Sequence, residues 1–227
     1  MKKILIGSYI LIIIGIIAVI SNSIIINGKD SKAATAGEKV YNKQCLLCHG
    51  ETGKGEGANA GTALNNQHFL NTVSNKDLYN YIKHGRIGTA MPAYGPRLSE
   101  KDLNNLVAFI RNWQTKEIEM EVPRTIAGDP ENGKKQYNVY CMNCHGEAGA
   151  GKFKMGPALA NPQYLKYTTD KQIWTDTAYG REETRMGPSL KGLEGVRQLK
   201  KADISDIVSY IRSINPKEET QNDYLKP

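Results

Sequence analysis

The stretch "CLLCHGETGKG" at residues 45–55 recurs almost unchanged as "CMNCHGEAGAG" at residues 141–151. Each copy places two cysteines, a histidine and several glycines within eleven residues. Residues of these types occur in zinc sites, redox dithiols, phosphate-binding loops and sites of covalent cofactor attachment. Because the stretch occurs twice, whichever of these sites it forms is present in two copies.

The similarity between the two copies extends well beyond the quoted stretch. At offsets of 95 to 101 residues, the further matching pairs are "GEKVYNKQ" at 37 with "GKKQYNVY" at 133, "GTAL" at 61 with "GPAL" at 156, "HGRIGTAMP" at 84 with "YGREETRMG" at 179, and "DLNNLVAFIR" at 102 with "DISDIVSYIR" at 203. The second copy has a six-residue insertion before the last pair. The repeat predicts two tandem domains, residues 33–116 and 128–216, with a linker at 117–127 and a flexible tail at 217–227.

The N-terminus differs sharply from the rest of the chain. After Lys2 and Lys3, residues 4–26 are uncharged and mostly apolar. A helix of that length measures about 35 Å, enough to cross a hydrocarbon core of about 30 Å, and it exceeds the apolar region of a cleavable signal peptide. We therefore predict that residues 1–32 form a single-pass membrane anchor and short tether, although "ATA" at 34–36 resembles a cleavage site. The two lysines place the N-terminus inside and the rest of the chain on the periplasmic side of the cytoplasmic membrane.

Local signals within each copy are helical. Residues 103–110 and 204–211 carry apolar side chains at helical spacing, and no convincing alternating strand appears. Capped helix starts are predicted at Ser74, Asp129 and Thr169, and helix ends at Gly85 and Gly180. Each domain is therefore predicted to be a few short helices joined by glycine-rich loops. So little regular structure indicates that a bulky group fills the middle.

The motif Cys-x-x-Cys-His is typical of covalent haem attachment. Two thiols one helical turn apart can bond the two vinyl groups, and the next residue directs an imidazole at the iron. A closed zinc site needs four ligands, and neither copy offers a second ligand pair at a familiar spacing. A thioredoxin-like dithiol requires a strand–helix context and has no use for the histidine.

Two further alternatives are weaker. A disulfide between such close cysteines closes too small a loop to stabilise a domain. "GKGEGANA" at 53–60 matches a dinucleotide-binding loop only weakly, with no strand before it. We therefore predict two covalently bound haem c groups, attached through Cys45, Cys48, Cys141 and Cys144, with His49 and His145 as iron ligands.

The repeat also indicates the second ligand of each iron. Met91 and Met186 align with each other and lie 42 and 41 residues after His49 and His145. A thioether is a soft ligand that stabilises ferrous iron and raises the reduction potential, as an electron carrier requires. Packing in the core is the usual role of a lone methionine, but the matched spacing favours iron ligation here.

The other candidate ligands lack a counterpart of the same type. Met155 aligns with Ala60. His68 and His84 align with residues other than histidine, so each is predicted to be a surface or loop histidine. Replacement of Met91 by one of these two histidines is the alternative for the first iron.

This constellation resembles the class I cytochrome c family, here as two tandem copies covering about residues 35–215. The resemblance implies an all-α fold in which three to four helices wrap around each haem, with His/Met ligation and one-electron transfer through a partly exposed haem edge. Family members often have a proline whose carbonyl accepts the imidazole N–H of the iron-bound histidine. Pro157 in "GPAL" matches that position, whereas Thr62 stands there in the first copy.

The resemblance predicts an electron carrier and not an enzyme. A membrane-anchored dihaem cytochrome c would pass single electrons from a quinol-oxidising complex or other donor to a terminal oxidase or reductase. The alternatives are a permanent haem subunit of a respiratory complex and, less favoured, a dihaem peroxidase or sulfur-compound dehydrogenase, because six-coordinate irons leave no open position. The net charge of +7 is spread along the chain without a basic block, so nucleic acid is not an expected partner.

Overall fold

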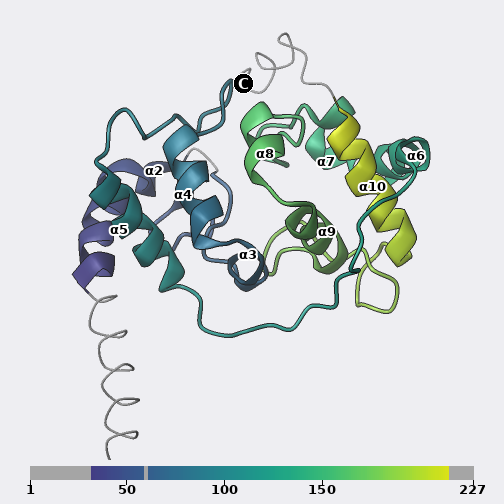
Figure 1. The fold of residues 1–227 in the computed structure, drawn as a ribbon, viewed down its shortest axis with the longest axis horizontal. Helices are drawn as coiled ribbons and strands as arrows, with labels where there is room; N and C mark the ends of the chain where they lie inside the picture. Colours follow the sequence, from purple (N-terminus) through teal and green to yellow (C-terminus); the bar gives the residue numbers. More distant parts are fainter. Residues whose placement is uncertain (1–31, 59–60, 215–227) are drawn as a thin grey trace, which may run out of the picture.

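The computed structural model describes residues 32–58 and 61–214 (Figure 1). The predicted membrane helix and the tail at 217–227 lie outside these residues. Within the described ranges the chain is mostly helical and has no β-strand beyond two isolated bridges, in agreement with the predicted all-α class. No helix in the same ranges is long and apolar enough to span a bilayer.

The helices recur in the same order in a first half, residues 32–116, and a second half, residues 128–214. Residues 32–44 are helical and begin the first half. The remaining elements of the first half are α2 (Leu46–His49), α3 (Gln67–Thr72), α4 (Asn75–His84) and α5 (Glu100–Arg111). Those of the second half are α6 (Pro130–Tyr140), α7 (Met142–His145), η1 (Glu147–Gly149), α8 (Pro162–Tyr167), α9 (Asp170–Tyr179) and α10 (Lys201–Ser213).

The predicted helix starts and ends are confirmed. The Ser74 hydroxyl accepts the amide proton of Asp77, whose carboxylate accepts from the Ser74 amide, so α4 begins with a capping box. Thr169 caps α9 in the same way with its hydroxyl. Helices α4 and α9 end at Gly85 and Gly180, which adopt positive φ angles of 59° and 69°.

A glycine brings the first helix of each half close to its last helix. A Cβ atom at Gly133 of α6 would overlap the main-chain oxygen of Asp206 on α10. In the first half, a Cβ atom at Gly37 would overlap the main-chain oxygen of Asn105 on α5. Each crossing therefore requires a residue without a side chain, and it fixes the helix that leads directly into a Cys-x-x-Cys-His motif.

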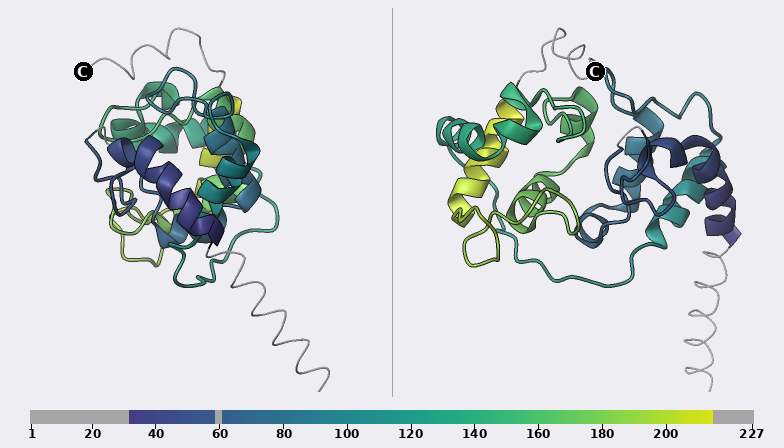
Figure 2. Two further views of the ribbon diagram at one scale, coloured as in Figure 1. Left: turned by 90° about the vertical axis from the view of Figure 1, so that its left-hand side faces the viewer. Right: turned by 180° about the vertical axis from the view of Figure 1, so that it is seen from behind.

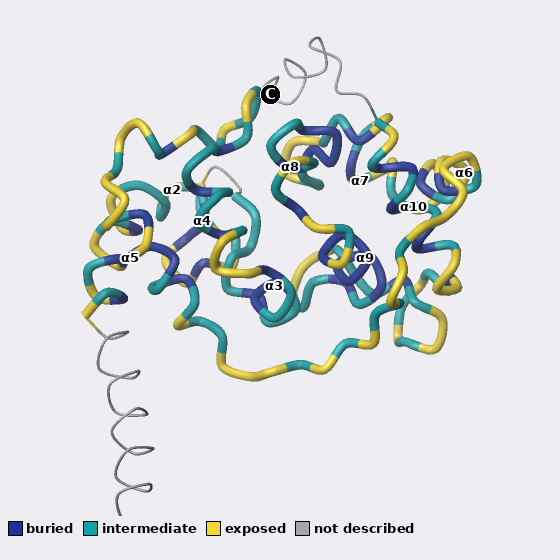
Figure 3. Tube along the Cα trace, viewed as in Figure 1, coloured by how far each residue is buried: buried dark blue, intermediate teal, exposed yellow. Residues whose placement is uncertain are grey.

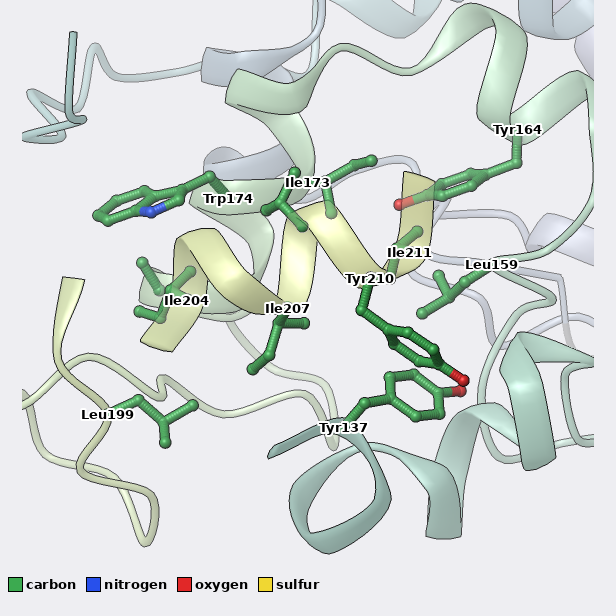
Figure 4. Packing of buried hydrophobic residues seen from close by; sticks show 12 residues of the cluster. Tyr137, Leu159, Tyr164, Ile173, Trp174, Leu199, Ile204, Ile207, Tyr210 and Ile211 are labelled. Carbon is green, nitrogen blue, oxygen red and sulfur yellow. The ribbon is translucent and has the colours of Figure 1, made fainter. Parts of the chain in front are cut away.

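The apolar positions predicted on the last helix of each half are buried in separate cores. On α10 these are Ile204, Ile207, Val208 and Ile211, each no more than 2 % exposed. Figure 4 shows Ile204, Ile207 and Ile211 facing Ile173 and Trp174 of α9. Trp174 is fully buried and donates its indole N–H to the Ser205 hydroxyl at 3.2 Å. The burial of each side chain of this size stabilises its half by about 1.5–3 kcal/mol.

The two halves lie side by side, and an extended linker connects them along one side (Figures 1 and 2). Helix α3 contacts α9, and α4 contacts α8, so the middle of each half faces the other. The linker is exposed along much of its length, whereas buried residues concentrate inside each half (Figure 3).

Candidate functional site

Each Cys-x-x-Cys-His motif forms one short helical turn held by a tyrosine. In both copies the histidine amide donates to the carbonyl of the first cysteine at 2.9 Å, so these two residues lie one turn apart. The buried Tyr41 donates its hydroxyl proton to the Gly50 carbonyl at 2.7 Å, and Tyr137 donates to the Gly146 carbonyl at 2.8 Å. The tyrosine therefore ties the preceding helix to the residue that follows the histidine.

The two motif histidines are buried in a fixed orientation. His49 and His145 are each 8 % exposed. Nδ1 of His49 lies 2.7 Å from the Thr62 carbonyl oxygen, and Nδ1 of His145 lies 3.0 Å from that of Pro157. Because a carbonyl only accepts, Nδ1 is the protonated nitrogen and Nε2 keeps the lone pair that can bind a metal.

Burial also keeps these imidazoles neutral. Removal from water lowers the pKa of both His49 and His145 below the usual histidine range, and the hydrogen bond to the carbonyl opposes this only in part. Neutral imidazole is the form that binds iron. The histidines are therefore in the ligand form at physiological pH.

A glycine in each half allows the carbonyl oxygen of Thr62 or Pro157 to approach the histidine. A Cβ atom at Gly61 would lie 2.9 Å from His49 Nδ1, and one at Gly156 would lie 3.1 Å from His145 Nδ1. Both would also press on the carbonyl group of the preceding cysteine. The glycines of the "GTAL" and "GPAL" stretches thus let the next residue's carbonyl reach the imidazole.

The cysteines lack the character of a reactive redox dithiol. Burial raises the pKa of Cys45 to about 12 and that of Cys141 to about 11. A reactive dithiol requires the opposite shift, toward a thiolate at neutral pH. Among the described residues, no group of three or more His, Cys, Asp or Glu side chains is arranged to hold a metal ion, whereas a closed zinc site needs four ligands.

A cavity of about 400 Å³ lies at the motif of the second half, and residues 54–55, 61–63 and 86 of the first half complete its wall. Cys141, Cys144, His145 and Met186 all line it, so the structure brings the predicted residues of the second site together. Cavities of this size hold cofactors and other small molecules. Met155 lines the cavity as well, with its sulfur 3.1 Å from an Arg185 guanidinium nitrogen.

Two of the predicted residues of the first site pack against one core. Cys45 and Met91 are both partly buried against the hydrophobic core of the first half. The Arg86 amide donates to the Met91 carbonyl at 2.8 Å, and the Arg181 amide donates to that of Met186 at 2.7 Å. Both methionines therefore end a loop that starts just after the glycine at the end of α4 or α9.

The cavity of the second half fits a haem through its charges as well as its ligands. Four arginines line it: Arg86, Arg181, Arg185 and Arg197. Arg197 Nε is buried and has no hydrogen-bond partner within the described structure. A guanidinium is the side chain best suited to bind carboxylates, so Arg197 is placed to bind a haem propionate.

Sequence reasoning missed Arg197 and Arg86. Arg197 lies in the region of the six-residue insertion, so the repeat offers no counterpart for comparison. Arg86 belongs to the first half but lines the cavity of the second. No sequence pattern within one copy could indicate a residue supplied by the other.

The two remaining histidines lie between the halves. The His68 ring donates from Nδ1 to the Gly180 carbonyl at 3.1 Å. The His84 ring stacks on Tyr167 with centroids 4.7 Å apart. Both rings therefore contact the second half. Sequence reasoning had predicted instead that each histidine lies on the surface or in a loop.

Comparison with known families identifies both halves. Residues 32–110 match the family described as cytochrome c oxidase, cbb3-type, subunit III. Residues 130–215 match the family described as cytochrome c. The two matches each contain one Cys-x-x-Cys-His motif.

Curated relatives are oxidase subunits. The chain is 27 % identical over 142 residues to the cbb3-type cytochrome c oxidase subunit CcoP of Azospirillum brasilense, covering 57 % of this chain and 45 % of the relative. It is 26 % identical over 163 residues to subunit CcoP of Azospirillum sp. (strain B510), covering 64 % and 52 %. Subunit FixP of Azorhizobium caulinodans is 33 % identical over 81 residues, or 36 % of this chain and 27 % of the relative. The chain thus spans about half or less of the length of the relatives it matches.

A solved structure shares the fold. A chain of the reducing HAO-like protein complex of Kuenenia stuttgartiensis superposes with a TM-score of 0.51 over 80 % of this chain and 96 % of that chain, at 19 % identity. Two matched cytochrome c families, two Cys-x-x-Cys-His motifs with buried histidines and a fitting cavity lead to one conclusion: the chain belongs to the dihaem c-type cytochromes and binds two haem c groups covalently.

Proposed function

We propose that this dihaem cytochrome carries single electrons on the outer face of the cytoplasmic membrane. The donor would be a quinol-oxidising complex or another reductant, and the acceptor a terminal oxidase or reductase. Residues 1–32 would anchor the chain through their apolar stretch. Residues 33–116 and 128–216 would be the two haem domains, with 117–127 as their linker.

One observation carries this proposal: a buried neutral histidine and a methionine line one cavity with two cysteines. In the second half these are His145, Met186, Cys141 and Cys144. We assign them as the two iron ligands and the two thioether anchors. His49, Met91, Cys45 and Cys48 have the same roles in the first half by their repeat positions.

The haem iron supplies a one-electron couple, and the chain's residues set the conditions for it. The carbonyls of Thr62 and Pro157 hold the histidines through Nδ1, which leaves the lone pair of Nε2 available to the iron. Arg197 and Arg185 bring positive charge to the cavity, which favours anionic propionates, whereas Arg181 is ion-paired with Asp176. Histidine and methionine ligands would leave no open position for peroxide or oxygen on either iron, which would favour carriage of electrons over catalysis.

The ligand assignment is tested by replacing the methionines one at a time. Met186→Ala should remove the contribution of the second haem to the long-wavelength sulfur-to-iron absorption band and lower its midpoint potential, because the soft ligand is lost. Met91→Ala should do the same for the first haem. Absorption spectra of the oxidised full-length protein and a redox titration measure both effects.

Met155→Ala is the matched control, because Met155 lines the same cavity as Met186. It should leave the band intact, since its sulfur already contacts Arg185. A band that survives Met186→Ala and disappears with Met155→Ala would reassign the ligand. Rapid turnover of peroxide by the wild-type protein would contradict the carrier function.

A second candidate is favoured by the curated relatives, which are oxidase subunits. On this view the chain is a permanent haem subunit of a respiratory complex rather than a mobile donor. Purification from native membranes in mild detergent distinguishes the two. A permanent subunit stays with oxidase polypeptides at a fixed ratio through a high-salt wash, whereas a carrier is recovered without them.

A further inference from the structure

The contact between the halves has an approximate two-fold symmetry. Helix α3 contacts α9, and α4 contacts α8. In the repeat α3 corresponds to α8, and α4 corresponds to α9. Each contact is therefore the counterpart of the other, as at the interface of a two-fold dimer, but here within one chain (Figure 1).

Two asparagines form the same hydrogen bond in opposite directions across this contact. The Asn66 side-chain amide donates to the main-chain oxygen of Glu182 at 2.7 Å. The Asn161 side-chain amide donates to the main-chain oxygen of Ile87 at 2.8 Å. The donors are 95 residues apart in sequence, and so are the acceptors. The two bonds are thus equivalent under the repeat.

Both acceptors lie in the loops that lead to the proposed methionine ligands. Ile87 follows Arg86, whose amide donates to the Met91 carbonyl. Glu182 stands in the same position of the loop that ends at Met186. Each loop is closed on itself, so holding its first residues in place also restricts its methionine.

An arginine and an aromatic ring reinforce each hydrogen bond. The Arg86 guanidinium lies over the Tyr164 ring, 5.1 Å from its centroid, and Arg181 lies over Phe69 at 4.6 Å. The rings are buried, 7 % and 5 % exposed. Each ring lies three residues after the asparagine on the same short helix. One helix therefore contacts the opposite loop through two side chains.

The same two asparagines also begin their own helices. Asn161 Oδ1 accepts the amide protons of Gln163 and Tyr164 at the start of α8, and Asn66 Oδ1 accepts that of Phe69 at the start of α3. The oxygen of each side chain thus serves its own half, and the nitrogen serves the other half. Because the two atoms have different roles, a mutation can remove the bond to the other half and keep the helix cap.

We propose that Asn66 and Asn161 are positioning residues that act across the contact between the halves, each holding the methionine loop of the other haem domain. The geometry of Met91 at the first iron then depends on the second half, and that of Met186 depends on the first half. This proposal rests on the ligand assignment made above. It makes the two haem sites one coupled unit rather than two independent carriers joined by a linker.

The test removes the side-chain N–H that Asn161 donates to Ile87 and keeps the side-chain oxygen that caps α8. Asn161→Asp retains Oδ1 for α8 but replaces the amide nitrogen with an oxygen facing the Ile87 carbonyl. In a Met186→Ala background the remaining sulfur-to-iron band reports Met91 alone. There, Asn161→Asp should lower the ratio of bound to unbound Met91 by about five- to tenfold, as loss of one hydrogen bond of ordinary strength implies, and the band should disappear at a lower temperature. Asn66→Asp should weaken the Met186 band in a Met91→Ala background.

Asn71→Asp is the control, because Asn71 lies on α3 and makes its side-chain bonds to the first half and the linker. It should leave both bands unchanged. Asn161→Ser, whose shorter hydroxyl can still cap α8 without adding charge, should act in the same direction as Asn161→Asp. Far-UV circular dichroism confirms that each variant is folded.

Each outcome of this series decides between the two proposals. If Met186→Ala and Met91→Ala behave as expected and Asn161→Asp leaves the Met91 band at its original melting temperature, the coupling is wrong and the ligand assignment stands. An effect of Asn161→Asp on Met186 in its own half, with none on Met91, would equally overturn the coupling. If neither methionine variant changes the band, the ligand assignment is wrong and the coupling is overturned with it.

Discussion

The hydrogen bond to the motif histidine is made by a main-chain oxygen in both halves. Thr62 supplies it to His49 at 2.7 Å, and Pro157 supplies it to His145 at 3.0 Å. Sequence reasoning assigned the carbonyl only to Pro157, because the proline matches a family pattern. Every residue type has a main-chain carbonyl, so the equivalent role of Thr62 could not be predicted from its identity.

Exchanging Pro157 for threonine should therefore have little effect on the second haem. The first half shows that a threonine at this position keeps the carbonyl within hydrogen-bond distance of the imidazole. We expect Pro157→Thr to shift the midpoint potential of the second haem by much less than Met186→Ala does. A redox titration of both variants checks this. A shift as large as that of the ligand variant would mean that the proline ring, and not its carbonyl, sets the site.

At the scale of single elements, an arginine at the end of the last helix holds the earlier helices of the same half. Arg212 on α10 contacts Asp170 Oδ1 at 2.6 Å and donates to the carbonyls of Leu165 and Thr168. Arg111 on α5 makes the corresponding bonds to residues 70, 73 and 75. One side chain thus joins the last helix to the turn between two others in each half.

Loss of this side chain should destabilise its half. Arg212→Gln removes a charged donor from two main-chain carbonyls, and we expect the free energy of unfolding to fall by about 2 kcal/mol. Arg124→Gln, at an exposed position of the linker, makes the same change of charge and should alter it by less than about 0.5 kcal/mol. Denaturant titration followed by far-UV circular dichroism measures both. Equal effects of the two variants would show that the three bonds of Arg212 contribute nothing.

Elements with local signals could be predicted, and shorter ones could not. The capping box at Ser74 and the apolar spacing on α10 depend on residues within a few positions of one another, and the structure confirms both. Helices α3 and α8 have only six residues each, too few to show a helical period. Their asparagine caps were present in the sequence as a signal, at equivalent repeat positions 66 and 161.

At the scale of the whole molecule, the contact between the halves was not predictable from the repeat. Within a single copy, helix capping is a sufficient role for Asn66 and Asn161. Arg86 and Arg181 are simply loop residues there. Their second role appears only when the two copies face each other in space. The two covalent haem groups were easier to predict, because their attachment requires particular side chains at a particular spacing.

Ion pairs also cross between the halves, but they are exposed. Lys54 lies 2.6 Å from Glu183, with the two side chains 50 % and 70 % exposed. Lys116 lies 3.2 Å from Glu182. Exposed pairs of this kind contribute about 0–1 kcal/mol and weaken as the Debye length falls from about 10 Å at 0.1 M salt to about 3 Å at 1 M. The buried aromatic and amide contacts should therefore hold the halves together at high salt.

Zero-length cross-linking of amines to carboxylates in the full-length protein tests this arrangement. At low salt, a carbodiimide should join Lys54 to Glu183, and the yield should be retained in about 1 M salt because the buried contacts are little screened. Lys83 and Glu100, 3.0 Å apart within the first half, form the internal control. In the Asn66→Asp, Asn161→Asp double variant, the yield between halves should fall while the control cross-link persists. If salt alone abolishes the cross-link between halves in the wild-type protein, the exposed ion pairs hold the halves together, and the buried contacts do not.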